Sequence, residues 1–342
     1  MTNTDPATGL ARGTFAVGTF CPPGGPSFAG LVLPDGAVID LAPEYRDTDA
    51  VFADWDRALD LMHRLAAHRS RPEARFEELD ARPPVAKPNL LGTGANYRQH
   101  VAEMMTHNAF NQHARHPGES NAEFFQRNLA EVDRRARSGI PFFWTGLHSS
   151  LAGANDDVRL PLVGASHDWE LEFACVLRGG GRYLGPDESG ALIAGYAIVN
   201  DLGTVDEFRR TDVRWGFDWV SKHQPGFKPF GPFVVPKEFV DRTQVRIHLA
   251  LNGETKQDWP ITDMIFTPEQ VLAYASERVR LLPGDVLLTG SPPGNGAMHG
   301  RFLQPGDVID SEITGLGRQR NRVRAEETGG RVPTYGRFPT TA

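Results

Sequence analysis

The sequence predicts a β-rich α+β fold in which a small N-terminal domain precedes a larger, sheet-dominated domain of roll-like or sandwich-like form. From residue 158 onward strand patterns dominate, separated by turn signals, at 171–178, 194–200, 244–251, 285–289 and 307–313. A single helical pattern interrupts them at 268–278, where Thr267 suits a cap and Pro268 a first turn. Strand and helix therefore do not alternate as a doubly wound sheet requires. The 36 glycines and 26 prolines are spread along the 342 residues, as frequent turns require.

The N-terminal part combines strand and helix patterns. Within 28–41, two apolar segments flank Pro34-Asp35-Gly36, a combination typical of a β-hairpin. Residues 54–66 follow with helical spacing of apolar side chains. Prolines at 83, 84 and 88 then break the pattern. We therefore predict a small β/α domain at 1–84 and a catalytic domain at 85–342, a division that suits a chain of this length.

Residues 104–140 differ from the rest of the main domain, because they are polar, contain three histidines and have few β-branched residues. Phe125, Leu129 and Val132 follow helical spacing, and Gly139 is placed to cap that helix. This pattern predicts a partly helical surface insertion. Its methionines and phenylalanines either form a lid over a larger, more apolar substrate or anchor the insertion to the domain.

Composition and charge give no indication that the protein binds nucleic acid or spans a membrane. Lys plus Arg is 36 and Asp plus Glu is 43, and the resulting net charge of −7 gives no indication of nucleic-acid binding. No run approaches the ~18 apolar residues that a membrane span needs. The two cysteines lie far apart and the N-terminus has no apolar core of a signal peptide, which favours a reducing compartment. We therefore expect a soluble, cytoplasmic protein that acts on a small molecule.

Two glutamates of one strand are the most informative pattern. In 168–177, alternation places four apolar side chains on one strand face, namely Leu171, Phe173, Cys175 and Leu177. Glu170 and Glu172 then share the other face, about 7 Å apart at Cα. Two carboxylates at the edge of an apolar surface repel each other unless a cation compensates them. Taken alone, the pair also suits a solvated strand face.

A third acid ends the strand that follows. Ala197, Val199 and Asp201 share one strand face in GYAIVND, so Asp201 again terminates an apolar stripe. Three carboxylates and water are a common way to hold Mg²⁺ or Mn²⁺ while leaving positions open for substrate oxygens. Glu170, Glu172 and Asp201 are therefore the predicted metal ligands.

Six segments, read together, resemble the fumarylacetoacetate hydrolase family. The segments match its motifs in order and spacing over roughly residues 85–325: G-x-N-Y-x-x-H-x-x-E at 94–103, D-W-E-x-E at 168–172, G-Y-x-x-x-N-D at 195–201, a block from Lys222 to Pro232, a block from Asn252-Gly253 to Pro283-Gly284-Asp285, and T-G-S-P-P-G at 289–294. The resemblance implies a mixed β-sandwich roll, a homodimer and a divalent metal. Mg²⁺ is the first expectation, with Mn²⁺ and Ca²⁺ as alternatives.

For chemistry, the resemblance implies a metal-dependent hydrolase that cleaves a carbon–carbon bond in a β-diketone or diketo acid. Alternative activities are those of a decarboxylase, isomerase or hydratase on a 2-keto or β-keto acid. A third possibility is an inactive family member that binds a partner or supports a structure. In the hydrolase, the metal would chelate two substrate oxygens and stabilise the developing enolate.

The same resemblance assigns roles to residues outside the carboxylate group. His100 would be the general base that activates water, and Glu103, three residues on, would orient it or share the proton. Lys222 would stabilise a substrate oxyanion. The substrate-binding residues would be Tyr97, Thr289, Gly290 and Arg209. Asp168 would contact a metal-bound water or simply begin the strand.

Four departures from the family pattern concern substrate recognition and ligand number. Val205 stands where acylpyruvate-cleaving relatives carry an arginine for the substrate carboxylate, and Arg209 or Arg210 would have to replace it. Gly146 replaces a lysine and Pro225 an aspartate. Thr93 stands where longer relatives have a fourth metal-binding carboxylate. We therefore expect the metal chemistry to persist on a substrate other than a small acylpyruvate.

Overall fold

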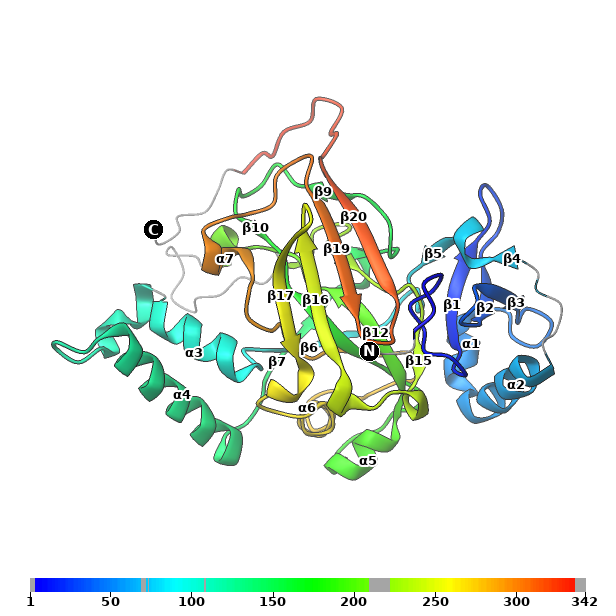
Figure 1. Ribbon diagram of the computed structural model, residues 1–342, viewed down its shortest axis with the longest axis horizontal. Coiled ribbons are helices and arrows are strands. Elements are labelled where there is room, and N and C mark those ends of the chain that lie inside the picture. Colours follow the sequence, from blue (N-terminus) through cyan, green and yellow to red (C-terminus); the bar gives the residue numbers. More distant parts are fainter. Residues whose placement is uncertain (1–3, 69–71, 73, 108, 209–221, 336–342) are drawn as a thin grey trace.

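The computed structural model describes residues 4–68, 72, 74–107, 109–208 and 222–335. They form two large packed sheets, a separate N-terminal sheet and a projecting helical hairpin (Figure 1). This arrangement confirms the predicted β-rich α+β fold. Within these ranges no helix combines the length and apolar character needed to cross a membrane.

The N-terminal sheet has five strands in the order β4-β3-β2-β1-β5. Its strands are β1 (Ala16–Cys21), β2 (Phe28–Val32), β3 (Ala37–Asp40), β4 (Ala74–Arg75) and β5 (Asp80–Arg82), and its helices are α1 (Thr48–Ala53) and α2 (Trp55–His68). The predicted hairpin is confirmed, because β2 and β3 pair antiparallel and Gly36 turns between them at φ 82°. The predicted helix at 54–66 corresponds to α2.

The larger part contains a six-stranded sheet in the order β15-β12-β11-β18-β6-β7 and a five-stranded sheet in the order β17-β16-β19-β20-β9. The first is built from β6 (Leu90–Gly94), β7 (Phe142–Gly146), β11 (Leu171–Leu177), β12 (Ile193–Asn200), β15 (Val235–Pro236) and β18 (Val286–Leu288). The second is built from β9 (Val158–Leu160), β16 (Arg246–Leu251), β17 (Glu254–Pro260), β19 (Val308–Ile313) and β20 (Arg318–Ala325). Short pairs join β8 (Leu151–Ala152) to β14 (Lys228–Pro229) and β10 (His167–Asp168) to β13 (Gly203–Thr204).

Two apolar clusters cover opposite faces of the six-stranded sheet. The predicted apolar face of β11, from Leu171 to Leu177, packs with residues of β16 and β19 in one cluster. Ala174, Val176, Ala197 and Val199 lie in the other cluster, together with side chains of the N-terminal sheet. Alternation therefore distributes β11 and β12 between two cores, as the pattern predicted.

The N-terminal sheet packs directly on the larger part. Val17 and Val234 exchange two backbone hydrogen bonds, at 2.9 and 2.8 Å, and their side chains belong to the same apolar cluster. The N-terminal sheet ends at β5 and the six-stranded sheet begins with β6. The domain boundary near residue 84 stays a prediction.

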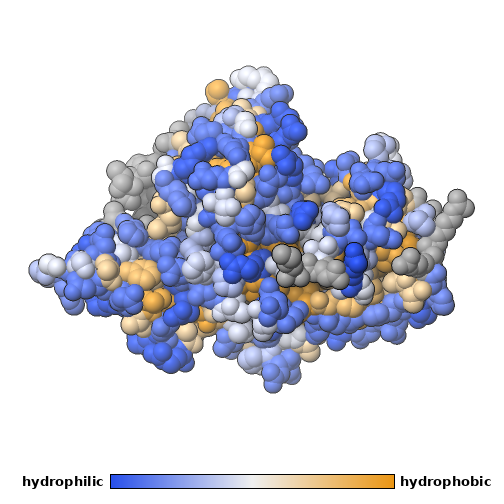
Figure 2. Space-filling view, in the orientation of Figure 1, coloured by the Kyte–Doolittle hydropathy of each residue, from blue (hydrophilic) through white to orange (hydrophobic). Residues whose placement is uncertain are grey.

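The segment at 104–140 contains most of a helical hairpin, formed by α3 (Arg98–His107) and α4 (Asn121–Ser138). The two helices project from the sheets on the side opposite the N-terminal sheet, and Figure 2 shows a group of apolar residues over them. Arg98 joins Asp133 at 2.6 Å, and Asn128 donates to Thr106 at 3.0 Å. The predicted cap is confirmed at Gly139. Because α3 also carries His100, the hairpin packing fixes the helix of the predicted base.

The remaining helices are α5 (Pro186–Ala191), α6 (Pro268–Ser276) and α7 (Gly296–His299). The predicted start of α6 is confirmed, since the Thr267 hydroxyl accepts from the backbone N–H of Gln270 and Pro268 occupies the first turn.

Candidate metal centre and active site

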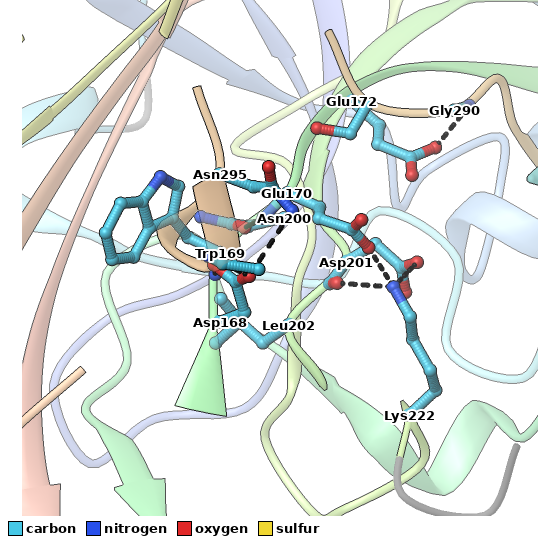
Figure 3. Close-up of polar contacts among 12 residues, drawn as sticks. Asp168, Trp169, Glu170, Glu172, Asn200, Asp201, Leu202, Lys222, Gly290 and Asn295 are labelled. Carbon is cyan, nitrogen blue, oxygen red and sulfur yellow. Dashed lines mark hydrogen bonds and ion pairs between the residues drawn. The ribbon is translucent and has the colours of Figure 1, made fainter. Parts of the chain in front are cut away.

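Strand pairing brings the three predicted carboxylates together. β11 begins where its antiparallel neighbour β12 ends, with Leu171 opposite Asn200. Glu170 and Asp201 therefore lie side by side just beyond the pair, and the Asp201 N–H donates to the Glu170 carbonyl at 2.8 Å. Carboxylate oxygens of Glu170, Glu172 and Asp201 lie within 4.8 Å of one another. Figure 3 shows how the three side chains lie. The group lies at the edge of an apolar sheet face.

Two of the three acids are held away from water, whereas the Glu170 side chain is 22% exposed. Glu172 is 3% exposed and Asp201 is 2% exposed. Burial, followed by the charges of Asp201 and Glu170, raises the pKa of Glu172 well above its ordinary value. Burial also raises the pKa of Glu170. For Asp201, burial acts upward, but the charges of Lys222 and Lys228 outweigh it and hold its pKa below the usual range. Asp201 is therefore the ionised member on which the lysines converge.

Two buried lysines compensate the carboxylates. The Lys222 ammonium contacts the carboxylates of Glu170 and Asp201, the latter at 2.6 Å, and donates to the Asp201 carbonyl at 3.1 Å (Figure 3). Lys228, which is 0% exposed, contacts the other Asp201 carboxylate oxygen at 2.7 Å. Burial opposes the charge of Lys222, but Asp201 and Glu170 raise its pKa above the ordinary value, whereas burial lowers the pKa of Lys228.

The donor set fits a hard divalent cation. Its ligand atoms are all carboxylate oxygens, two of the three residues are buried, and the oxygens lie close enough for one ion to touch all three. Three carboxylates face two ammonium groups, so formally one negative charge is left over. A cation there would relieve the repulsion that raises the pKa of Glu170 and Glu172.

His100 lies on α3 and is 4% exposed. Burial, reinforced by the charge of Lys222, lowers the pKa of His100 to about 4, so the ring is neutral at pH 7. Its Nδ1 atom is buried and has no hydrogen-bond partner among the described residues. A neutral imidazole with an unpaired nitrogen, within electrostatic reach of Lys222, can accept a proton.

Glu103 lies on the same helix but interacts elsewhere. Its carboxylate accepts a hydrogen bond from the side-chain amide of Gln99 at 2.6 Å. Since His100 Nδ1 is unpaired within the part of the chain that the structure describes, Glu103 does not orient His100 through that atom. The proposed proton sharing between the two stays a prediction.

Tyr97 and the loop at 289–290 lie against the carboxylates. Tyr97 is 0% exposed, and its hydroxyl has no hydrogen-bond partner in the described ranges. Burial and the charge of Glu172 raise its pKa well above the ordinary value, so the hydroxyl keeps its proton and can donate a hydrogen bond to a substrate oxygen. The preceding residue, Asn96, donates to the Thr289 carbonyl at 2.8 Å and thereby ties Tyr97 to this loop.

Thr289 and Gly290 were predicted to donate hydrogen bonds to the substrate. In the structure both donate to other residues of the protein. The Thr289 hydroxyl donates to the Phe173 carbonyl at 2.6 Å. The Gly290 N–H donates to the Glu172 carboxylate at 2.6 Å (Figure 3). In this geometry the loop positions β11 and Glu172, and the substrate-binding role of both residues stays a prediction.

Replacing Gly290 with alanine should weaken divalent-metal binding at least about tenfold, because the loop holds a ligand carboxylate. Gly290 has φ +91°, and an added Cβ would lie 2.9 Å from Asn96 Cβ, so the loop must shift. Titration with MnCl₂ measures the effect. Gly253→Ala is the matched control, since Gly253 has φ +81° with nothing within 4 Å of the added Cβ. Equal metal affinity in the two variants would show that Gly290 does not position Glu172.

Gln257 ties the loop after β18 to β11, and Asp168 of β10 holds the start of α7. Gln257 accepts from the Leu171 N–H and donates to Ser291 and to the Pro292 carbonyl, each at 3.0 Å. Asp168 accepts from the backbone N–H groups of Gly296 and of Ala297, the latter at 2.9 Å. Burial and the charge of Glu170 raise the pKa of Asp168 to about 7. Both Asp168 oxygens accept from backbone, which supports a positioning role for Asp168.

Arg209 and Arg210 lie outside the described residues, so the predicted contact of Arg209 with substrate stays a prediction. Val205 lies in a short 3₁₀ turn, Val205–Glu207. Asp206 accepts from the backbone N–H groups of Ala165 and Ser166, at 3.0 and 2.9 Å. The position that resembles the family's arginine therefore offers an apolar side chain.

Sequence reasoning missed Lys228. Its signal was the surrounding Phe227-Lys228-Pro229-Phe230, an apolar context that predicts burial. A buried lysine needs an acidic partner, and Asp201 was the nearest predicted strand-end acid along the chain.

Sequence comparison finds enzymes that are similar to this chain over about half of its length. The chain is 35% identical over 187 residues to 2,4-didehydro-3-deoxy-L-rhamnonate hydrolase of Sphingomonas sp. (strain SKA58), covering 54% of this chain and 65% of that protein. It is 34% identical over 187 residues to the mitochondrial oxaloacetate tautomerase FAHD2A of Homo sapiens, covering 54% and 59%. The chain thus spans less than two thirds of the length of these relatives.

A solved structure shows the same fold. Maleylpyruvate hydrolase from Sphingobium sp. SYK-6, in complex with manganese(II) ion and pyruvate, superimposes with a TM-score of 0.69 at 19% identity, covering 91% of this chain and 100% of that chain. The family model "Fumarylacetoacetate (FAA) hydrolase C-terminal" matches residues 89–324, which is more than half of the chain. Both the fold and this match agree with the ordered motifs, and the chain belongs to the fumarylacetoacetate hydrolase family.

Proposed function

We propose that the protein is a divalent-metal-dependent hydrolase that cleaves a carbon–carbon bond between two carbonyl groups of a diketo acid. The proposal is carried by a neutral His100 whose Nδ1 has no partner among the described residues and which lies within electrostatic reach of Lys222. Lys222 in turn contacts Glu170 and Asp201 of the carboxylate group. Mg²⁺ is the first candidate metal and Mn²⁺ the alternative, because the ligands are all oxygens. The name of the Sphingomonas relative describes a 3-deoxy acid oxidised at carbons 2 and 4, which is a substrate of this class.

The chain's residues account for the steps of such a hydrolysis. A bound divalent cation would polarise the substrate carbonyls and stabilise negative charge on their oxygens. His100 would take a proton from water as the water oxygen bonds to the distal carbonyl carbon. When the carbon–carbon bond breaks, its electron pair goes to the carbon between the carbonyls, and protonated His100 returns the proton there. Lys222 and Tyr97 would contact substrate oxygens that become negative.

Tautomerisation is the second candidate. The human relative carries that activity in its name, and a single base beside a polarised carbonyl suffices to move a proton between carbon and oxygen. His100 would then act on the carbon between the carbonyls, and no water would be added. The two reactions share their residues and differ in whether a carbon–carbon bond breaks.

Product analysis in isotopically labelled water separates the two. A panel of 2,4-dioxo acids and simple β-diketones is incubated with the protein and MnCl₂ in H₂¹⁸O, and products are identified by NMR and mass spectrometry. The proposal predicts two products, one an acid with one newly introduced ¹⁸O in its carboxyl group beyond simple carbonyl exchange. Interconversion of keto and enol forms without cleavage would instead support the tautomerase, and no change in any substrate would contradict both.

A further inference from the structure

Lys228 is the second buried lysine beside the carboxylate group, and the oxygens around its nitrogen indicate whether it is protonated. Its ammonium nitrogen donates to the backbone carbonyls of Lys222 and Leu202, the latter at 3.2 Å, and lies 2.7 Å from an Asp201 carboxylate oxygen. Three oxygens therefore surround one nitrogen. An ammonium donates to the two carbonyls and forms an ion pair with the carboxylate, whereas a neutral amine has only two N–H bonds and no charge for that pair. The geometry is that of a protonated lysine.

Each of the two lysines contacts a different oxygen of the Asp201 carboxylate. Lys222 contacts one carboxylate oxygen at 2.6 Å and Lys228 contacts the other at 2.7 Å. Two of the three Lys228 contacts are to backbone carbonyls, so Lys228 is anchored independently of Asp201. Lys222 instead contacts two carboxylates and is held by a single backbone oxygen. A cation that binds the acids can displace Lys222 more readily than Lys228.

The positive charge of Lys228 opposes the entry of a metal, although the group as a whole is negative. With three carboxylates and two ammonium groups, the group is formally one unit negative, and a divalent ion makes it one unit positive. The incoming ion and Lys228 would share one carboxylate, so they would lie only a few ångströms apart in a buried site, where like charges repel strongly. The same ammonium compensates Asp201 while no metal is bound.

We infer that Lys228 is a resident countercharge that keeps the carboxylate group assembled without metal and lowers its affinity for divalent cations. This inference rests on the metal site of the proposed function. It makes Lys228 a positioning residue for Asp201, and it makes metal loading reversible. Removing the charge should therefore have opposite effects on the metal-free and the metal-bound protein.

Lys228→Met tests this with readouts that do not depend on turnover. Titration of the metal-free protein with MnCl₂, followed by calorimetry, gives the dissociation constant, and thermal unfolding gives Tm with and without the ion. We expect Mn²⁺ to bind at least about tenfold more tightly. The metal-free Tm should fall, and the Tm increase caused by Mn²⁺ should exceed that of the wild type.

Lys237→Met is the matched control, because Lys237 is exposed and its ammonium donates to the Gly190 carbonyl rather than to the carboxylate group. It should leave the Mn²⁺ affinity unchanged. The control therefore distinguishes the effect of the charge at Lys228 from the effect of changing the net charge of the protein. Lys228→Arg keeps the charge and should not bind Mn²⁺ more tightly than wild type. Unchanged or weaker Mn²⁺ binding by folded Lys228→Met would overturn the inference.

A second variant covers the case in which Lys228→Met does not fold. Lys228→Gln removes the charge but keeps a donor for a backbone carbonyl. If both neutral variants are unfolded without metal, the inference predicts that saturating MnCl₂ restores folding, and failure of the ion to do so would overturn it. The metal site itself fails separately, if wild-type protein and all variants bind no Mn²⁺.

Discussion

Replacing Glu172 with glutamine is expected to lower divalent-metal affinity at least about a hundredfold and to abolish turnover, because one of three ligand carboxylates is lost. The same change should stabilise the metal-free protein at neutral pH. Burial and two neighbouring acids raise the pKa of Glu172, so its ionised form costs folding free energy. Glutamine keeps the shape and an acceptor for the Gly290 N–H but carries no charge.

The pH dependence of that stabilisation has a defined sign. A carboxyl group with a raised pKa holds more protons folded than unfolded, so its cost is absent at low pH and grows as pH rises above the ordinary value of 4.5. Chemical unfolding of metal-free wild type and Glu172→Gln from pH 4 to pH 8 should diverge accordingly. Glu269→Gln is the control, since Glu269 is half-buried but pairs with Arg242 outside the group. Normal Mn²⁺ binding by Glu172→Gln would refute the role of this ligand.

Replacing His100 with glutamine should reduce kcat by about 10²–10⁴-fold, the usual contribution of a general base, while Mn²⁺ affinity stays within about twofold of wild type. His100 offers a buried, unpaired nitrogen but belongs to α3 rather than to the carboxylate group. Steady-state kinetics at saturating Mn²⁺ and calorimetric titration measure the two quantities. His107→Gln, at the exposed end of the same helix, is the control. Turnover within about tenfold of wild type would exclude His100 as the base.

His100 also predicts a pH effect on stability. Because burial lowers its pKa to about 4 from 6.5, the unfolded chain takes up a proton between these values while the folded chain does not. Folding therefore loses stability as pH falls from 6.5 to about 4, by on the order of 3 kcal/mol at most. Urea unfolding of His100→Gln should lack this component, and an identical pH dependence in both proteins would contradict the buried, neutral histidine.

Local sequence patterns predicted the strands and the faces of the metal group well. Alternation from Leu171 to Leu177 placed Glu170 and Glu172 together, because the side-chain period of a strand leaves no other choice. Local alternation does not predict that Asp201 lies beside the two glutamates. That position depends on the register of β11 and β12, which sets Leu171 opposite Asn200. That register joins residues far apart in sequence, and only the ordered family motifs anticipated it.

The parts that the sequence did not predict are long-range polar contacts. Gly290 was interpreted as a substrate donor, yet its N–H holds Glu172, because the loop after β18 passes directly beside β11. Glu103 lies at helical spacing from His100 but bonds Gln99 instead. Lys228 was overlooked because an isolated lysine is usually exposed. In each case the partner is decided by tertiary packing rather than by local spacing.

We propose that Glu170, Glu172 and Asp201 bind one divalent ion. Anomalous diffraction from crystals soaked in MnCl₂ tests it most directly, because it locates manganese independently of activity. We expect one strong peak about 2.0–2.3 Å from a carboxylate oxygen of each of the three residues. A protein saturated with Mn²⁺ whose anomalous peak lies away from these carboxylates, or which shows no peak between them, would contradict it.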